Sequence, residues 1–443
     1  MKNIMTKTII FLLCFITPLF SEAILTTGYK PKTLLDKMPS NHVADTRNIK
    51  QNTTLLSKQV KPMSRWEQNR YDRAYNRKFF RPWFRKRLNL SWKQKRWQFV
   101  FARQKIYTRY GKRISRKWFN YQRRNSNFKD YESVLKHAIT IRHTDLKIYP
   151  TKQDFYYNPK RVGEGFPFDY NQNSSLNINT PLIVSHYSKD RKWAYVRCAY
   201  AYGWLPVKDI ALVSKYFKKQ FMNNNYAVTI RDNLFIKDKN FKSIVKLGTI
   251  FPIDPKTKKY MIATRTKSGY AKIKLLNVKQ KWIIAKKPIA FNSTNVALIS
   301  NQLIGERYGW GGKMSARDCS GLTRDFFAPF GIFLRRNSQE QRYDGKRVIS
   351  IRWMSNKRKK RTILKKAKPF RSLLYVKGHI ALYVGKRNGE PLILHNYWGA
   401  RLNSGKKRIF GRAILTTTQI GKERRDIKKR AMLLNTFSKI INF

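Results

Sequence analysis

Hydrophobic positions along the chain change their spacing twice, and each change predicts a different kind of structure. Between Ser64 and Asn127, aromatic residues recur among basic ones, and Trp97 and Phe101 are one helical turn apart. From about residue 138, short apolar runs alternate with turn residues, as in small antiparallel β units. From about residue 292, one helix-length run leads into a series of strand-length runs. We therefore predict an α+β protein in which helices come first, β units follow, and a mixed domain comes last.

Two sets of strand-length runs lie between residues 138 and 290, and their boundary falls near residue 215. A loop containing Gly163–Asp169 interrupts the first set. Each set has the length and the turn spacing of a small closed β structure. We therefore expect two consecutive small β-barrels, at residues 138–215 and 216–290. The clearest predicted strands are 181–185, 193–197, 202–206, 227–230, 244–251, 260–264 and 269–273.

The N-terminus has the organisation of a secretory signal. Two lysines precede an apolar run from Ile9 to Phe20, and Ser21–Ala23 has the small residues of a cleavage site. We expect residues 1–23 to be removed on export to the periplasm or cell envelope, with secretion as a further possibility. Residues 24–63 are polar and lack periodicity, so we predict a linker there. Residues 421–443 are predicted to be a basic tail.

Positive charge is the main feature of the composition. The 443 residues include 95 Lys and Arg against 24 Asp and Glu, a formal net charge of +71. The segment Arg65–Lys129 alone holds 22 basic residues and two acidic ones. We therefore predict a basic aromatic helical arm over residues 64–137. Its aromatic stripe is expected to be buried against the next domain. Such charge favours polyanionic surroundings. For an exported protein these are anionic envelope polymers or lipid surfaces, and nucleic acid is the weakest candidate. The sequence does not indicate an oligomeric state.

Cys319 is the candidate nucleophile of the chain. It follows the glycine-rich turn Tyr308–Gly312 and lies within Asp318–Leu322, at the expected start of a helix. A helix N-terminus directs backbone N–H groups at the sulfur, which favours the reactive thiolate. His379 enters one apolar strand and His395 ends another. We expect His379 to form a thiolate–imidazolium pair with the cysteine, and His395 to orient it as the third member of a triad.

These residues also have simpler interpretations. A single cysteine is more often a buried inert thiol, but here the turn, the cysteine and both histidines follow in an order that suits catalysis. Two histidines and a cysteine could also hold zinc. The sequence shows no fourth ligand, so we predict no metal. Cys198 lies in a strand of the first β unit, where we expect a structural role and no bridge to Cys319.

The last domain, at residues 291–420, resembles the NlpC-type peptidases, papain-like cysteine enzymes that cut peptidoglycan stem peptides. The motifs that carry the resemblance are Asp318–Leu322, Phe330–Gln341 and Gly378–Gly385. The arm and the two β units also fit the family, in which the β units are bacterial SH3-like domains. Arg335 departs from the family pattern, which usually has Pro there, and we expect only a local effect on the loop. The resemblance implies a papain-like catalytic domain.

The resemblance also implies roles for six residues and a reaction. The reaction would be hydrolysis of the bond between γ-D-glutamate and the L-linked diamino acid, without a metal or organic cofactor. Two other functions stay open: a non-catalytic envelope-binding protein, and an amidase or acyltransferase on the same scaffold. The implied roles are nucleophile for Cys319, general base for His379, orienting residue for His395, oxyanion support for Tyr308, and binding of the substrate's free amine for Asp318 and Ser320.

Overall fold

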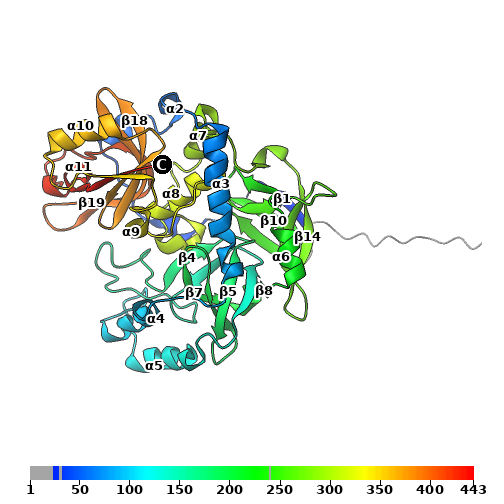
Figure 1. Cartoon of the computed structure of the whole chain (residues 1–443). Coiled ribbons are helices and arrows are strands. Elements are labelled where there is room, and N and C mark those ends of the chain that lie inside the picture. Colours follow the sequence, from blue (N-terminus) through cyan, green and yellow to red (C-terminus); the bar gives the residue numbers. More distant parts are fainter. Residues whose placement is uncertain (1–22, 29–31, 239–240) are drawn as a thin grey trace, which may run out of the picture.

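The computed structural model describes residues 23–28, 32–238 and 241–443 (Figure 1). The expected signal peptide therefore lies outside the described residues, except for Ala23. In the part of the chain that the structure describes, no helix is long and apolar enough to cross a membrane. Helices come first, two β units follow, and a domain of helices packed on a sheet comes last, which confirms the predicted α+β class.

The first β unit is a seven-stranded sheet with the strand order β4-β3-β7-β6-β5-β2-β8. Its core is formed by inward-facing aliphatic side chains such as Leu146, Val184 and Leu205, which are completely buried. The predicted strands at 181–185, 193–197 and 202–206 are confirmed. Strands β3, β4 and β8 are short or polar, which is why their spacing did not reveal them. The bounds are β2 (Lys136–Thr140), β3 (Thr144–Lys147), β4 (Gln172–Leu176), β5 (Pro181–Tyr187), β6 (Trp193–Arg197), β7 (Tyr202–Pro206) and β8 (Ile210–Leu212).

The second β unit combines two sheets, with the orders β11-β10-β1-β14-β13 and β12-β9-β15. Strand β1 (Ala23–Thr26) lies between β10 and β14, and Ala23 and Leu25 are completely buried there. The start of the segment that we predicted as a linker is therefore a central strand. The remaining bounds are α6 (Lys215–Phe221), β9 (Tyr226–Thr229), β10 (Leu234–Asp238), β11 (Phe241–Val245), β12 (Ile250–Pro252), β13 (Tyr260–Arg265), β14 (Ala271–Val278) and β15 (Ile284–Lys286).

The last domain is built on a six-stranded antiparallel sheet with the order β16-β21-β17-β18-β19-β20. Helix α8 packs Leu322 and Phe326 into the core on this sheet. Strand β21 lies between β16 and β17, so residues that we predicted as a basic tail form an internal strand. The bounds are α7 (Ser293–Asn301), α8 (Cys319–Phe327), α9 (Ser338–Gln341), α10 (Asn356–Lys366), α11 (Leu433–Thr436), β16 (Arg347–Ser350), β17 (Ser372–Val376), β18 (His379–Arg387), β19 (Glu390–Arg401), β20 (Lys407–Thr417) and β21 (Lys439–Asn442).

Residues 32–63 also differ from a linker, because they run over the last domain in short helices. The Gln51 side chain donates to and accepts from the main chain of Leu415, with both distances 2.9 Å. Asp45 accepts the backbone N–H of Thr417 at 2.7 Å. These polar side chains therefore form hydrogen bonds with the main chain at the edge strand β20. This role explains why residues 32–63 are polar and lack hydrophobic periodicity. The helices are α1 (Ala44–Asn48) and α2 (Thr54–Ser57).

The first helix of the arm, α3 (Arg65–Phe80), runs between the last domain and the second β unit (Figure 1). Asp72 on this helix forms a buried ion pair with Lys287. At its C-terminal end the Trp83 indole donates to the carbonyl of Ala138 at 2.7 Å and packs against Phe217 and Phe221. The predicted burial of the aromatic stripe is confirmed for Trp83 and its neighbours, whereas Trp66, Phe84 and Trp92 are exposed.

The rest of the arm lies against the first β unit. It comprises α4 (Trp92–Arg96), a 3-10 segment at Trp97–Arg103 and α5 (Arg116–Asn125). Buried Gln98 attaches the middle of this segment: its side chain accepts from the Trp204 indole at 3.3 Å, and its carbonyl accepts from the Tyr149 hydroxyl at 2.5 Å. The arm is thus fixed beside the strands that face the last domain.

Candidate active site

Cys319 is the first residue of α8, and Asp318 caps that helix by accepting the backbone N–H of Gly321 at 2.7 Å. The cap forms because Asp is one of the best N-cap residues. The sulfur receives backbone N–H groups from Ile380 and Ser320. Ile380 follows His379 at the start of β18, so the Ile380 contact places the histidine backbone beside the thiol. The structure thus brings the predicted nucleophile and its predicted base together.

The two histidines form a hydrogen-bonded chain whose direction can be deduced. The Thr416 hydroxyl donates to the carbonyl of Thr417 at 2.9 Å, so it accepts from Nε2 of His395, 3.1 Å away. Nδ1 of neutral His395 is therefore an acceptor, and Nε2–H of His379 donates to it at 2.9 Å. That tautomer leaves Nδ1 of His379 without a proton. His379 is then ready to act as a base.

Burial sets the protonation states of this pair. It raises the pKa of the Cys319 thiol to about 12, with the nearby Asp318 carboxylate adding to the effect. It lowers the pKa of His379 to about 4, and it also lowers the pKa of His395, which the neighbouring His379 lowers further. The expected thiolate–imidazolium pair is therefore wrong for the unliganded protein, because desolvation disfavours both charges. The resting pair is a thiol and a neutral imidazole.

Tyr308 lies against the same cleft, in an aromatic cluster with Phe168 and Trp398. Burial raises the pKa of its hydroxyl well above the usual value, and the proximity of Cys319 and Asp318 contributes. The phenol therefore keeps its proton and can donate a hydrogen bond. This is the property that the oxyanion role predicted for Tyr308 requires.

Asp318 is held by more contacts than the sequence indicated. Arg336 forms a two-pronged pair with its carboxylate at 3.0 and 2.8 Å, and Gly311, Gly321 and Ser320 also donate to it. A carboxylate has about four acceptor positions, so five donors fill them. Arg336 and the helix cap lower the pKa of Asp318 although burial raises it. A free ammonium group would have to displace one of these donors, and the amine-binding role of Asp318 and Ser320 stays a prediction.

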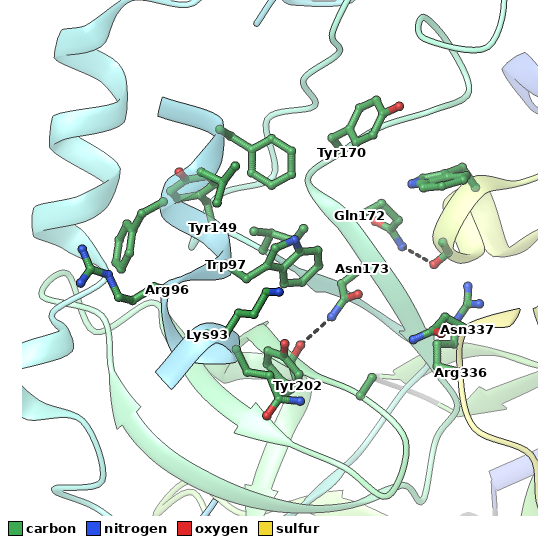
Figure 2. A pocket seen from close by; sticks show the side chains of 18 of the residues that line it. Lys93, Arg96, Trp97, Tyr149, Tyr170, Gln172, Asn173, Tyr202, Arg336 and Asn337 are labelled. Atoms are coloured by element: carbon green, nitrogen blue, oxygen red, sulfur yellow. Dashed lines mark hydrogen bonds between the residues drawn. The ribbon is translucent and has the colours of Figure 1, made fainter. Parts of the chain in front are cut away.

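A large cavity of about 1360 Å³ leads from Cys319 across the first β unit to the arm. Figure 2 shows Lys93 and Trp97 of the arm pointing toward Asn173 and Tyr202 of the first β unit, with Arg336 at the other end. The arm is therefore a wall of the cleft as well as a packing element. Sequence reasoning missed this wall, because no local signal relates residues 92–104 to a cysteine more than two hundred positions later.

The two cysteines within the described ranges, Cys198 and Cys319, are both free thiols. Cys198 is buried, and its sulfur accepts the backbone N–H of Ala201 at 3.2 Å, which fits the structural role that we expected. In the described part of the chain, no three His, Cys, Asp or Glu side chains are grouped so that they could hold a metal ion.

Comparisons with known proteins agree with this arrangement. Residues 305–412 match the NlpC/P60 family, residues 12–131 match the N-terminal NLPC_P60 stabilising domain, and residues 154–206 match an SH3 domain of the SH3b1 type. The chain thus contains an NlpC/P60 domain preceded by the stabilising domain and an SH3 domain, which confirms the resemblance seen in the sequence. The second β unit stays a predicted SH3-like domain.

One solved structure shares the fold over most of the chain. An NlpC/P60 endopeptidase from Photobacterium damselae subsp. piscicida is 22% identical, with a TM-score of 0.80 over 91% of this chain and 98% of that one. An NlpC/P60 family protein from Bacillus cereus ATCC 10987 is 13% identical, with a TM-score of 0.46 over 69% of this chain and 99% of that one. At these identities the likeness concerns the fold. No curated protein sequence matches the chain.

Proposed function

We propose that the protein is an exported cysteine endopeptidase that hydrolyses peptidoglycan stem peptides, at the bond between γ-D-glutamate and the diamino acid. The observation that carries the proposal is the position of Cys319 at the start of α8, beside a His379–His395 pair whose tautomers leave His379 Nδ1 as a base. The NlpC/P60 match and the SH3 domain support peptidoglycan as the substrate. The predicted signal peptide supports the cell envelope as the location.

In this mechanism His379 Nδ1 takes the thiol proton as the sulfur attacks the γ-glutamyl carbonyl carbon. Tyr308 and a backbone N–H at Cys319 donate to the oxygen that becomes negatively charged. His379 then gives its proton to the leaving amine, and a thioester to Cys319 remains. Water, deprotonated by His379, attacks the thioester carbonyl, the C–S bond breaks, and the proton on His379 returns to the Cys319 sulfur as the glutamate carboxyl group is released. His395 keeps the imidazole in the reactive tautomer throughout, as the third member of a triad does.

The test is mass spectrometry of defined muropeptides after incubation with the wild type and with Cys319→Ala. New fragments that end in γ-D-glutamate, produced only by the wild type, would support both the activity and the bond. Cys198→Ala is the matched control, because it removes the other free thiol of the described residues and is expected to leave the products unchanged. Intact muropeptides with folded wild-type protein would contradict the proposal and favour the envelope-binding alternative.

A further inference from the structure

Positive charge is concentrated in one short segment of the last domain. Residues 352–368 include nine basic residues and no acidic one among 17, against 95 basic residues in the 443 of the whole chain. Most of the segment forms α10, on which exposed Lys357, Arg361 and Lys365 follow one another at four-residue spacing. Like charges at this spacing destabilise a helix. The stability of α10 therefore does not explain the charge, which points to a partner outside the chain.

Helix α10 lies on the face of the six-stranded sheet opposite to Cys319. Successive side chains of a strand point to opposite faces of a sheet. On β17, Leu373 packs into the hydrophobic cluster that contains Cys319, whereas Leu374 packs into the cluster that contains Ile363 of α10. Figure 1 shows α10 on the outer side of the last domain. None of the described residues that line the cavity at Cys319 comes from 352–368.

The basic surface of α10 is held in place and continues onto a neighbouring segment. Lys359 Nζ donates to the carbonyl of Asn435 at 2.6 Å, and the Asn435 side chain donates to the carbonyl of Lys429 at 2.7 Å. Lys429 therefore lies beside α10. Within this surface, Lys360 forms an ion pair with Glu390. The α10 face, as we call it, consists of exposed Arg352, Trp353, Lys357, Arg358, Arg361, Lys365, Lys366, Lys429 and Arg430.

An exposed tryptophan distinguishes the α10 face from a purely ionic surface. Trp353 shortly precedes α10 and is 86% exposed, and the Arg352 guanidinium lies 4.5 Å from its ring centroid. Tryptophan beside Lys and Arg is typical of surfaces that contact the membrane–water interface, where the indole enters the headgroup layer and the cations meet anionic lipids. A soluble polyanion would attract the same cations but has no apolar layer for the indole.

We propose that the α10 face binds the surface of a bilayer that contains anionic lipids. The lipid phosphates contact the basic side chains, and Trp353 enters the headgroup layer. Because the sheet separates α10 from Cys319, the cleft of the bound protein faces away from the bilayer. The inference goes beyond the proposed function, since binding to lipid does not depend on peptidase activity.

The test is co-sedimentation of the mature chain, residues 24–443, with vesicles of phosphatidylcholine alone or mixed with phosphatidylglycerol. We expect binding to the mixed vesicles only. In the triple variant Lys357→Glu, Arg361→Glu, Lys365→Glu, partitioning onto the mixed vesicles should fall by about a hundredfold or more, because each basic residue near an anionic surface favours binding about fivefold. Trp353→Ala should weaken partitioning about tenfold, since the ring no longer leaves water.

Matched controls change equivalent side chains elsewhere on the surface. Lys267→Glu, Lys279→Glu, Lys281→Glu makes the same change of charge at exposed residues of the second β unit. Trp66→Ala removes an indole that is 66% exposed and, like Trp353, lies beside an arginine, Arg70. Both controls should stay within about threefold of the wild type, because charges farther than a Debye length from the bilayer are screened.

Equal weakening by the two triple variants would show that net charge governs binding, and would overturn the proposal. Binding that Trp353→Ala leaves unchanged and soluble polyphosphate displaces would assign the face to polyanions and also overturn it. Thermal denaturation checks that each variant folds. If charge reversal unfolds α10, Lys357→Gln with Arg361→Gln repeats the test without introducing acidic side chains, and is expected to weaken binding about twentyfold or more. Failure of the muropeptide assay would leave these results unaffected.

Discussion

Nε2 of His379 lies 2.9 Å from Nδ1 of His395. The hydrogen bond between His395 and Thr416 fixes which of these two nitrogen atoms carries the proton. The proposed mechanism depends on an imidazole that is unprotonated on the side of the thiol. Here the protonation state of the base is determined by a hydroxyl group two hydrogen bonds away from it.

Removing the Thr416 hydroxyl should impair catalysis without changing the cleft. In Thr416→Val, His395 Nε2 loses its acceptor, so the tautomers of both histidines are no longer fixed. We expect kcat to fall about tenfold, since a hydrogen bond contributes about 1 kcal/mol and about 1.4 kcal/mol corresponds to a factor of ten in rate. KM should change little. The control is Thr418→Val, since Thr418 is equally buried and its hydroxyl has no partner among the described residues. Equal loss of kcat in both variants would contradict the direction assigned to the hydrogen bonds that run from His379 through His395 to Thr416.

The pH dependence of activity should follow the lowered pKa of His379. Because burial brings that pKa to about 4, from an ordinary value of about 6.5, the imidazole stays neutral down to mildly acidic pH. Activity should therefore fall as the pH drops through about 4, and an acid limb of kcat/KM near 6.5 would contradict this. The same shift makes the folded state lose stability as the pH falls from about 6.5 toward 4, since only the unfolded chain binds the proton readily there.

The high pKa of Cys319 predicts slow alkylation. With the thiol protonated up to about pH 12, iodoacetamide should modify the unliganded protein slowly at pH 7, and the rate should rise with pH well beyond that. The Cys319→Ala protein supplies the background rate. Rapid, pH-independent modification between pH 6 and 8 would instead indicate a stable thiolate–imidazolium pair.

The Arg336–Asp318 pair should contribute strongly to stability. Arg336→Met leaves a buried carboxylate without its two-pronged partner, and breaking such a pair costs about 3–5 kcal/mol. The double variant Asp318→Asn, Arg336→Met should be less destabilised than Arg336→Met alone, because no unpaired charge remains. Urea denaturation of the two single variants and the double variant measures the coupling. Additive costs would show that the pair is not coupled.

Attachment of the arm can be tested with two neighbouring aromatic residues. Trp83 is 2% exposed, whereas Phe84 is 70% exposed. Trp83→Ala should reduce the free energy of unfolding by about 3–5 kcal/mol, because it removes a large buried ring and its hydrogen bond to Ala138. Phe84→Ala should stay within about 0.5 kcal/mol of the wild type. Similar thermal denaturation of both variants would contradict the packing of the arm.

The sequence predicted what is encoded locally and missed what depends on distant partners. Cys319 and His379 could be singled out as candidates because a helix start and an apolar strand are visible in short stretches, and the structure has both elements there. The partners of Asp318 were not, because Arg336 and Gly311 approach it only in the folded chain. The direction of the thiol pKa was predicted wrongly for a related reason: the helix N-terminus is local, whereas burial of the sulfur is a property of the whole cleft.

Two segments that appeared unstructured in the sequence, β1 and β21, each occupy the inside of a sheet. Strand β21 pairs with both β16 and β17, and β1 pairs with both β10 and β14. The six-stranded sheet that carries His379 and His395 is therefore complete only when residues 439–442 lie between β16 and β17. Loss of this strand would leave β16 without its partner in the sheet and would expose one edge of β17.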